Sequence, residues 1–573
     1  MVSRSLSCPG KVTLCLVTFA FVAVYQRSLA ETRALHWDTF VDRFVEDYFV
    51  AHPDFAVRAG RHEFDGKLPD WSRAGLAKEA ERLGSNRKRA LEFDPAKLDK
   101  QQRFERDYLI AVIERDLFWL TSARWPFKNP MAYASALDPN VYVARAYAPL
   151  DARMRAYIDY AKAVPNAVKQ IRSNLRTPLP HTYVDIGKKF FGGLAAYYQE
   201  DVPKVFAGVH DAALQTEFRA ANAQAMRVLK ELTQWFEAQR AQATDDFALG
   251  ADLFAQMLRD TERVEVSIDR LEKIGREDVD RNLRALRQAC ASFSQKTIQE
   301  CIAAVQTDKP KNGAVDGARQ QLPELKRFVR AKGLVTIPGP EEAEVDESPP
   351  YHRWNPAYID IPGAFDKGLP AVYYVAPPDP AWSKAEREAY IPGKATLLFI
   401  SVHEVWPGHF LQSLHARRLQ SKLGQLFVSY GFAEGWAHYT EELMWETGLG
   451  EGDPMIHAGQ LLDALRRDVR FLSALGLHTG GMTLKESEQM FRELAYQDPG
   501  NTRQQAARGT FDPAYLNYTL GKLMIRKLRE EWTASRGGRK AWRAFHDTFL
   551  SYGGPPIPLV RKAMLGPNAG PPL

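Results

Sequence analysis

Apolar residues recur at helical spacing along most of the chain. In residues 214–236 they stand three or four positions apart, at Leu214, Phe218, Ala221, Ala225, Leu229, Leu232 and Phe236. Such steps keep side chains on one face of an α-helix, so this segment is predicted to be an amphipathic helix. Similar stripes run through residues 151–175 and 253–303. The pattern therefore predicts a mainly α-helical protein.

Strand-like patterns are few. The segment GLPAVYYVAPP, residues 368–378, is rich in β-prone side chains and is bounded by prolines. Because proline cannot donate a ladder hydrogen bond, this profile predicts a short edge strand, which could pair with an extended peptide. Neighbouring side chains on a strand point to opposite faces, so at most one of Tyr373 and Tyr374 would line a cleft. We take Tyr374 as the candidate.

The longest loop-like stretch is IPGPEEAEVDESPPYHRWNP, residues 337–356, which is rich in proline and acidic residues. One interpretation is a hinge between an N-terminal helical region, residues 31–336, and a C-terminal region, residues 337–573, that holds the chemistry. The alternative is a surface loop in one continuous domain, with the two regions packed as one interleaved unit.

The N-terminus has the layout of a secretory signal peptide. Arg4 and Lys11 precede an apolar run at residues 12–25, and SLA at residues 28–30 offers small residues for a cleavage site. The run is short for a transmembrane helix. We expect cleavage after Ala30 and a periplasmic or secreted protein without stable membrane insertion. The alternative, an uncleaved anchor, also places the protein outside the cytoplasm.

Net charge gives no argument for a nucleic acid or an acidic lipid as partner. The full chain of 573 residues carries a formal charge of +6. Removal of residues 1–30 takes away three basic and no acidic residues, which leaves +3. A nearly balanced protein of this size has no electrostatic preference for polyanions.

Two cysteines, Cys290 and Cys301, remain after cleavage, and an exported compartment would allow them to pair. Along one straight helix they would be separated by about 16 Å. A disulfide therefore requires a turn between them, and the sequence leaves the pairing open.

The stretch ISVHEVWPGHFLQ, residues 400–412, begins like a zinc-protease signature. That signature, H-E-x-x-H, places two histidines four residues apart on one helix face, with the glutamate as base. Here His403 and Glu404 are followed at the fourth position by Pro407, and the next histidine, His409, is six residues after His403. In a straight helix six residues turn by about 240°, so the two histidines would not share a face.

Pro407 also offers a way to restore the geometry. It cannot donate a hydrogen bond to the carbonyl of residue 403, and its ring crowds that carbonyl. Gly408 makes a local distortion less costly. We therefore predict a bulged or broken helix between Glu404 and His409, with both imidazoles facing a third ligand. The alternative is a histidine pair that is satisfied at a helix end.

A second helical segment, GFAEGWAHYTEELMWE at residues 431–446, supplies the third ligand. Glu434, His438 and Glu441 recur at steps of four and three, on one face. Such a stripe is commonly a solvated surface, but the apolar neighbours leave little room for an exposed helix. Glu434 would complete a His-His-Glu site, with His438 or Glu441 orienting the ligands.

At these residues the sequence resembles a known family. HEVWPGHFLQ, EGWAHYTEE, GLHTGG and PAYLNYTLGKLMIRKLR occur in the order seen in the bacterial domain of unknown function 885 family. The resemblance covers nearly the whole mature chain, with the specific motifs in its last third. The family is grouped with gluzincin metallopeptidases and is similar to helical oligopeptidases and carboxypeptidase Taq.

The resemblance implies one Zn²⁺ ion, held by His403, His409 and Glu434, with Glu404 as general base. It also implies that His478 and Tyr518 could donate a hydrogen bond to an oxyanion, a contribution of roughly 3–4 kcal/mol for one donor. Their alternatives are a capping histidine and a core tyrosine. Family members often carry an acidic residue where this chain has Ala474, two residues before the glycine of GLH.

Basic residues near these motifs are candidates for binding a substrate carboxylate. Arg467 and Arg470 are the main ones, and the others are Arg466, Lys522 and Arg526. The alternative for each is a solvated charge on a helix.

The sequence thus predicts an exported, mainly α-helical, zincin-like zinc peptidase with a small sheet edge beside its active site. The expected substrates are short peptides. Two alternatives stay open, namely a metal-dependent hydrolase of a non-peptide amide or ester, and a non-catalytic exported helical binding protein.

Overall fold

The computed structural model describes residues 36–293 and 297–573, and it confirms the mainly helical prediction. The predicted signal peptide lies outside the described residues. None of the described helices is both long enough and apolar enough to cross a membrane.

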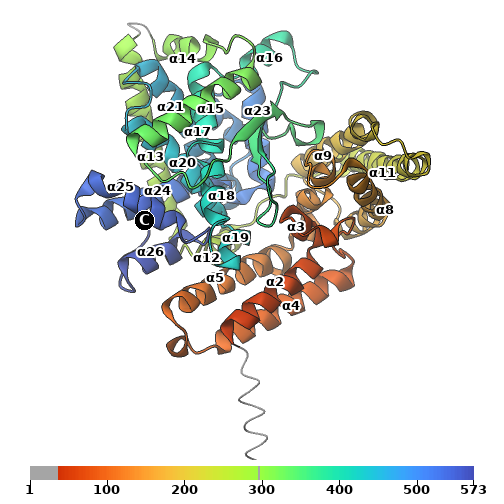
Figure 1. Cartoon of the computed structure of the whole chain (residues 1–573). Helices are drawn as coiled ribbons and strands as arrows, with labels where there is room; N and C mark the ends of the chain where they lie inside the picture. Colours follow the sequence, from red (N-terminus) through yellow and green to blue (C-terminus); the bar gives the residue numbers. More distant parts are fainter. Residues whose placement is uncertain (1–35, 294–296) are drawn as a thin grey trace, which may run out of the picture.

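The N-terminal part forms two helical layers against a larger body (Figure 1). One layer contains α2, α4 and α5, and the other contains α8, α9 and α11. The apolar stripe predicted in residues 214–236 is buried along α11, which confirms that prediction. The helices are α2 (Trp37–Ala51), α3 (Pro53–Arg58), α4 (Arg73–Glu92), α5 (Lys100–Leu117), α6 (Trp125–Lys128), α7 (Asn140–Val143), α8 (Leu150–Asn174), α9 (His181–Glu200), α10 (Val202–Phe206) and α11 (Ala212–Gln239).

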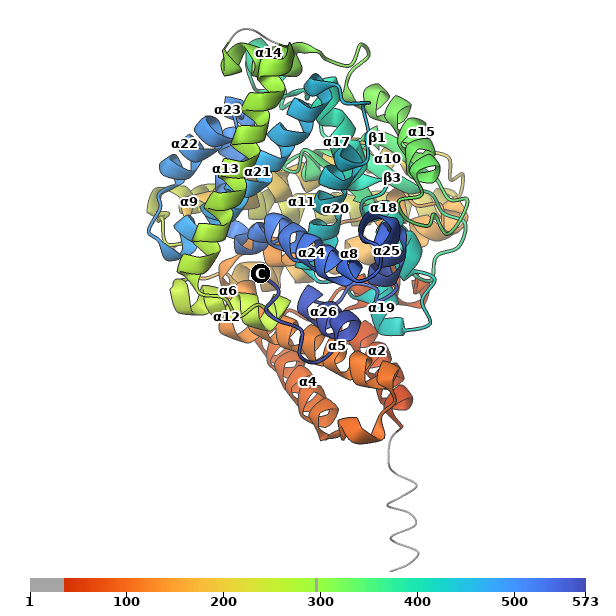
Figure 2. The ribbon, with the colours of Figure 1, turned by 90° about the vertical axis from the view of Figure 1, so that its left-hand side faces the viewer.

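The body holds the remaining helices around the largest apolar core. Two long pairs run side by side at its centre, α13 with α21 and α20 with α24 (Figure 2). The helices are α12 (Ala251–Glu262), α13 (Ile268–Phe293), α14 (Ile298–Thr307), α15 (Ala314–Lys332), α16 (Lys384–Tyr390), α17 (Lys394–Glu404), α18 (His409–Ala416), α19 (Lys422–Leu426), α20 (Tyr430–Glu446), α21 (Pro454–Thr479), α22 (Leu484–Leu494), α23 (Pro499–Phe511), α24 (Asn517–Ala534), α25 (Trp542–Leu550) and α26 (Ile557–Leu565).

A three-stranded sheet lies against this body in the order β1-β3-β2. β1 (Ala343–Glu347) pairs in parallel with β3 (Ala371–Val375), and β2 (Ala357–Asp360) pairs antiparallel with β3. The prediction that residues 368–378 form an edge strand is therefore wrong, because β3 is central. The flanking prolines lie just outside Ala371–Val375, so every amide within the strand can join a ladder.

The segment 337–356 contains β1, whose Val345 is buried in the same core as Phe254 of α12 and Val402 of α17. Residues before and after position 337 thus share one core, and the segment contributes a strand to it.

Cys290 near the end of α13 and Cys301 in α14 form a disulfide, with their Cα atoms 5.5 Å apart. The two cysteines stand on separate helices, which supplies the change of direction that pairing requires. The pairing that the sequence left open is therefore made.

We expect the double variant Cys290→Ala/Cys301→Ala to lose about 3 kcal/mol of unfolding free energy. The bond closes a loop with a sequence separation of 11 residues, which restricts the unfolded chain. Chemical denaturation measures the change. Reduction should lower the stability of the wild type by a similar amount and leave the double variant unaffected; equal stability of the two proteins would refute the expectation.

Candidate metal centre

The helix that carries the first histidine breaks as predicted. α17 ends at Glu404 and α18 begins at His409, with a cis peptide bond between Trp406 and Pro407 in the connecting turn. His403 and Glu404 therefore occupy the last turn of one helix, and His409 opens the next. This confirms the predicted break between Glu404 and His409.

Close backbone contacts fix the shape of this turn. The Gly408 amide donates to the Val402 carbonyl at 3.0 Å, and a Cβ atom at position 408 would lie 1.7 Å from the His403 carbonyl oxygen. Only glycine leaves room for that approach. From α20, the Trp436 indole donates to the Pro407 carbonyl at 2.9 Å. The turn is thus held from both sides.

The variant Gly408→Ala is expected to weaken binding of Zn²⁺ to these histidines by roughly tenfold or more, because displacing a ligand should cost at least as much as losing its hydrogen-bonding partner. The added methyl group would push against backbone and move His409 away from His403. Gly84→Ala in α4 is the matched control, since its Cβ meets no atom within 4 Å. Wild-type metal affinity in Gly408→Ala, measured by titration, would show that the close approach is not needed.

Three side chains converge beyond the break. The Nε2 atoms of His403 and His409 lie 3.1 Å and 3.3 Å from the same carboxylate oxygen of Glu434 in α20. One ligand atom from each residue lies within 4.8 Å of the other two. Both imidazoles face Glu434, as predicted, so the three residues form a compact set of donors for a metal ion.

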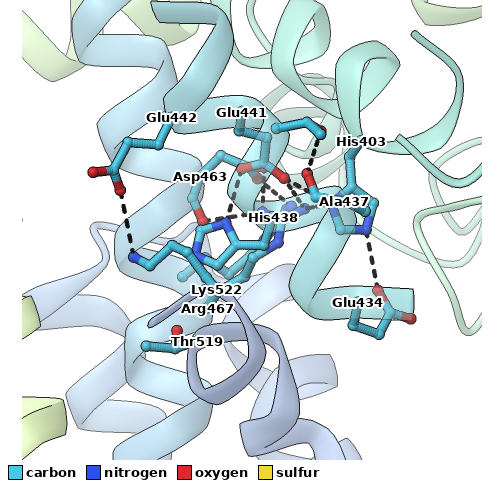
Figure 3. Close-up of polar contacts among 12 residues, drawn as sticks. His403, Glu434, Ala437, His438, Glu441, Glu442, Asp463, Arg467, Thr519 and Lys522 are labelled. Carbon is cyan, nitrogen blue, oxygen red and sulfur yellow. Dashed lines mark hydrogen bonds and ion pairs between the residues drawn. The ribbon is translucent and has the colours of Figure 1, made fainter. Parts of the chain in front are cut away.

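A buried polar layer orients His403 from behind (Figure 3). The Nδ1 atom of His403 lies 2.7 Å from Oε1 of Glu441, and Nδ1 of His438 lies 3.2 Å from Oε2 of the same carboxylate. Arg467 forms ion pairs with both Glu441 and Asp463. A hydrogen bond from Nδ1–H of His403 to Glu441 leaves the Nε2 lone pair directed at the cluster.

Burial and neighbouring charges set the protonation of the cluster. Burial, assisted by Arg467, lowers the pKa of His403 to about 3, so its imidazole is neutral and able to bind a metal. Burial opposes the ionisation of Glu434, but His409 and His403 hold its pKa well below the usual range. Burial raises the pKa of Glu404 to about 7. A neutral imidazole, His403, and an ionised carboxylate, Glu434, therefore stand beside Glu404, whose pKa lies near neutrality.

Removal of the orienting carboxylate should weaken metal binding without abolishing it. For Glu441→Gln we expect a 10- to 100-fold loss of zinc affinity, roughly the effect of losing such a hydrogen-bonding partner. A competition titration against a chelating dye measures it. Gln retains the size of Glu, so an intact helical circular-dichroism spectrum would accompany the loss. Unchanged affinity would remove Glu441 from this role.

The cluster opens into a cavity of about 470 Å³. His403, Glu404, His409 and Glu434 line it, and Tyr358 and Ile359 of β2 form part of its wall. On another side it is bordered by α3 and α19. The cavity therefore lies where the N-terminal helical layer, the sheet edge and the body meet.

Tyr518 of α24 lines the same cavity, with its ring 5.9 Å from the His403 ring and nearly parallel to it. Arg508 donates to the Tyr518 hydroxyl at 3.3 Å and to the Tyr430 hydroxyl at 2.9 Å. Asp512 accepts from Arg508 and from Tyr430, each at 2.9 Å. Arg508 was not predicted from the sequence, because nothing in its local pattern distinguishes it from a solvated charge.

Residues 53–564 match the model of the family described as "Bacterial protein of unknown function (DUF885)". The chain belongs to the DUF885 family. No curated protein matches it. A solved structure from Shewanella oneidensis, described as a "putative lipoprotein of unknown function", shares 24% identity and a TM-score of 0.75, over 93% of this chain and 100% of that one. Another from Colwellia psychrerythraea, also described as a "putative lipoprotein", shares 17% identity and a TM-score of 0.77, over 92% and 98%. These likenesses show a shared fold.

The DUF885 resemblance placed His478 at the site, but this residue lies away from the cavity. Its Nδ1 accepts from the Leu249 amide at 3.2 Å, and its Nε2 donates to the Gly509 carbonyl at 2.8 Å. It does not line the cavity. The prediction of an oxyanion donor at His478 is wrong, because both ring nitrogens are occupied by backbone groups.

The predicted carboxylate-binding residues are also engaged elsewhere. Arg470 donates to Gln505 at 2.7 Å, and Arg467 belongs to the layer behind His403. The remaining three pair with buried or half-buried acidic side chains: Arg466 with Asp463, Lys522 with Asp278, and Arg526 with Glu442. None of the five lines the cavity. The prediction that they bind a substrate carboxylate is therefore wrong.

Tyr374 does not line the cavity either. It is buried in β3, and its ring stacks on that of Tyr358 with centroids 5.1 Å apart. Tyr358, on the edge strand β2, lies in the cavity wall where Tyr374 was predicted. This error follows directly from the misplaced edge strand.

Proposed function

We propose that this DUF885 protein is a zinc-dependent peptidase. The observation that carries the proposal is the convergence of His403, His409 and Glu434 in a cavity, with Glu404 directly beside them. This is the residue set of a catalytic zinc site, in which three protein ligands leave one position open and a carboxylate handles the proton.

The donors suit zinc in type, and both imidazoles stand at a suitable distance from the carboxylate. Two imidazoles and one carboxylate suit Zn²⁺. Ligands at about 2.0–2.1 Å in a tetrahedral arrangement lie roughly 3.3 Å from one another. The 3.1 Å and 3.3 Å distances from the two Nε2 atoms to Glu434 agree with that spacing. Glu441 behind His403 matches the hydrogen-bonded carboxylate that accompanies many zinc-bound histidines.

When bound, zinc supplies Lewis-acid activation of a water molecule and of the scissile carbonyl. Glu404 takes a proton from the attacking water and passes it to the leaving amine. Burial raises the pKa of this carboxyl group, which favours its return of the proton to the leaving amine. Tyr518, held by Arg508, donates a hydrogen bond from its hydroxyl to the carbonyl oxygen as negative charge develops there.

The sheet edge favours a peptide as substrate. Among the strands of the described chain, β2 pairs with β3 alone, and on its other side the backbone of Ile359 hydrogen-bonds the Glu404 carboxyl beside the cavity. An extended peptide can form backbone hydrogen bonds to such an edge. Esters and isolated amides would not use this edge, so the peptide class is preferred over them.

Export of the protein is part of the proposal. The two fold relatives are described as lipoproteins, and the signal-like N-terminus of this chain has the same implication. The disulfide between Cys290 and Cys301 also suits an oxidising compartment.

The proposal is tested with protein purified without chelators. A defined peptide mixture is incubated with it, and the products are mapped by mass spectrometry beside simple amides and esters. We expect one zinc per chain and cleavage of peptides. Hydrolysis of the amides or esters alone would favour the non-peptide alternative, and zinc-free, inactive protein would favour a binding protein.

A further inference from the structure

The cavity beside the proposed zinc ligands contains an arginine that forms no ion pair with any of the described residues. Arg417 follows the last residue of α18, is half-buried, and lines the same cavity as His409 at the start of that helix. We infer that Arg417 is a substrate-binding residue that pairs with a carboxylate of the peptide, a few residues from the cleaved bond. This inference rests on the proposed peptidase function and specifies its substrates.

Asp366 and Glu341 lie near enough to attract the charge of Arg417, but neither carboxylate makes a direct contact with its guanidinium. Its Nη2 donates to the backbone carbonyl of Asp366 at 2.6 Å, and it forms no ion pair within the described chain. The Asp366 carboxylate is already engaged by three other groups, namely Arg145 at 3.6 Å, His62 at 3.3 Å and the Gly363 amide at 2.8 Å. The guanidinium is thus anchored by one nitrogen, while its other nitrogens can donate to a ligand.

Neighbouring arginines show the contrast. Arg58, which also lines the cavity, pairs with Asp54 at 2.8 Å and donates to the Ser135 carbonyl. Arg418, next in the chain, pairs with Glu341 at 2.5 Å and does not line the cavity. Burial lowers the pKa of Arg417, so a carboxylate ligand would relieve the cost of its charge.

The α18 face between the metal centre and Arg417 forms a continuous wall. The cavity is lined by His409, Gln412, Ser413, Ala416 and Arg417. The last four stand three, four, seven and eight residues after His409, so all five share one helix face. Eight helical residues span about 12 Å. An extended peptide covers roughly 3.3–3.6 Å per residue. A carboxylate on Arg417 would therefore stand about three or four residues from the scissile bond.

Two carboxylates of a peptide could occupy this position. One is the C-terminal carboxylate of a short peptide, and the other is the side chain of Asp or Glu within a longer one. Their chemistry is the same, and the test separates them.

The test measures binding to full-length, zinc-loaded protein carrying Glu404→Gln, so that a bound peptide is not consumed. The probes are an acetylated, alanine-based hexapeptide with a free C-terminus, its C-terminal amide, and amides with one Asp or Asn at each successive position. Affinities are measured by calorimetry in this background, with Arg417→Gln, and with Arg418→Gln as the matched control. Circular dichroism verifies folding.

We expect the free acid, or the Asp peptide at one position, to bind about tenfold or more tightly than its neutral counterpart. Arg417→Gln should abolish that preference, and Arg418→Gln should retain it. Tighter binding of the free acid identifies the terminal carboxylate, and tighter binding of an Asp peptide identifies a side chain. A preference that survives Arg417→Gln, or no preference among peptides that bind, overturns the inference alone. Failure of every peptide to bind overturns the peptidase proposal with it.

Discussion

Glu404→Gln is expected to lower kcat for peptide hydrolysis by about 10²- to 10⁴-fold while one zinc ion per chain is retained. Glu404 lines the cavity beside the proposed ligands, and none of the three ligands is changed by the substitution. Gln keeps the shape of the side chain but cannot take a proton from water. The loss should therefore appear in kcat, and zinc affinity should be nearly unchanged.

The measurement compares kcat from peptide cleavage with zinc content from elemental analysis of the same samples. Glu277→Gln in α13 serves as control, since that side chain is 59% exposed and lies on the surface. The control should behave like the wild type. Full activity in Glu404→Gln, with zinc present, would exclude Glu404 as the general base.

Glu434→Ala is expected to remove both zinc and activity. The variant leaves two imidazoles as ligands and takes away the negative charge that offsets the charge of the ion. The loss of affinity should exceed the 10- to 100-fold expected for Glu441→Gln, because a ligand is removed rather than its hydrogen-bonding partner. At a zinc concentration that just saturates the wild type, the variant should bind little metal.

A control for this variant is available on the same helix. Glu446→Ala changes the last residue of α20, about 18 Å along the helix from Glu434. Its carboxylate pairs with Arg529 and is absent from the cavity. Dye competition should give wild-type zinc affinity for this control. If Glu434→Ala also binds zinc like the wild type, Glu434 is not a ligand.

The layer behind the ligands explains how buried charges are tolerated here. Glu441, Arg467 and Asp463 are each almost fully buried, and ions in such a position are costly unless they are paired. Their mutual ion pairs meet that condition, and Glu441 uses its remaining capacity on His403 and His438. The charged layer thus fixes the orientation of the imidazole that faces Glu434.

The local features of the site could be predicted from sequence. Pro407 and Gly408 restrict the backbone between the two histidines in any fold, so the helix break could be predicted from the sequence. The buried apolar stripe of α11 could be predicted for the same reason, because helical periodicity is a local property. Glu434 could be found because it stands on a strongly patterned helix close in sequence to His409.

The errors concern contacts between distant parts of the chain. His478 looked available until the backbone of residues 249 and 509 occupied both of its nitrogens. The arginines of α21 looked like substrate ligands because their acidic partners could not be identified from the pattern. Conversely, no local pattern marks Arg417, which differs from its neighbours in forming no ion pair within the described part of the chain.

The order of strands could not be predicted for a related reason. Prolines that flank a short strand are compatible with an edge strand, and also with a central strand whose ends they mark. The order that places β3 between β1 and β2 depends on pairing between residues up to 28 positions apart, and this is decided by tertiary packing.

The most direct test of the zinc centre is anomalous diffraction from crystals grown without added metal or chelator, with data collected on both sides of the zinc absorption edge. We expect one zinc-specific peak, bonded at about 2.0–2.2 Å to Nε2 of His403, Nε2 of His409 and the carboxylate of Glu434. A zinc peak held by other residues, or no peak at these three in crystals soaked with zinc, would contradict it.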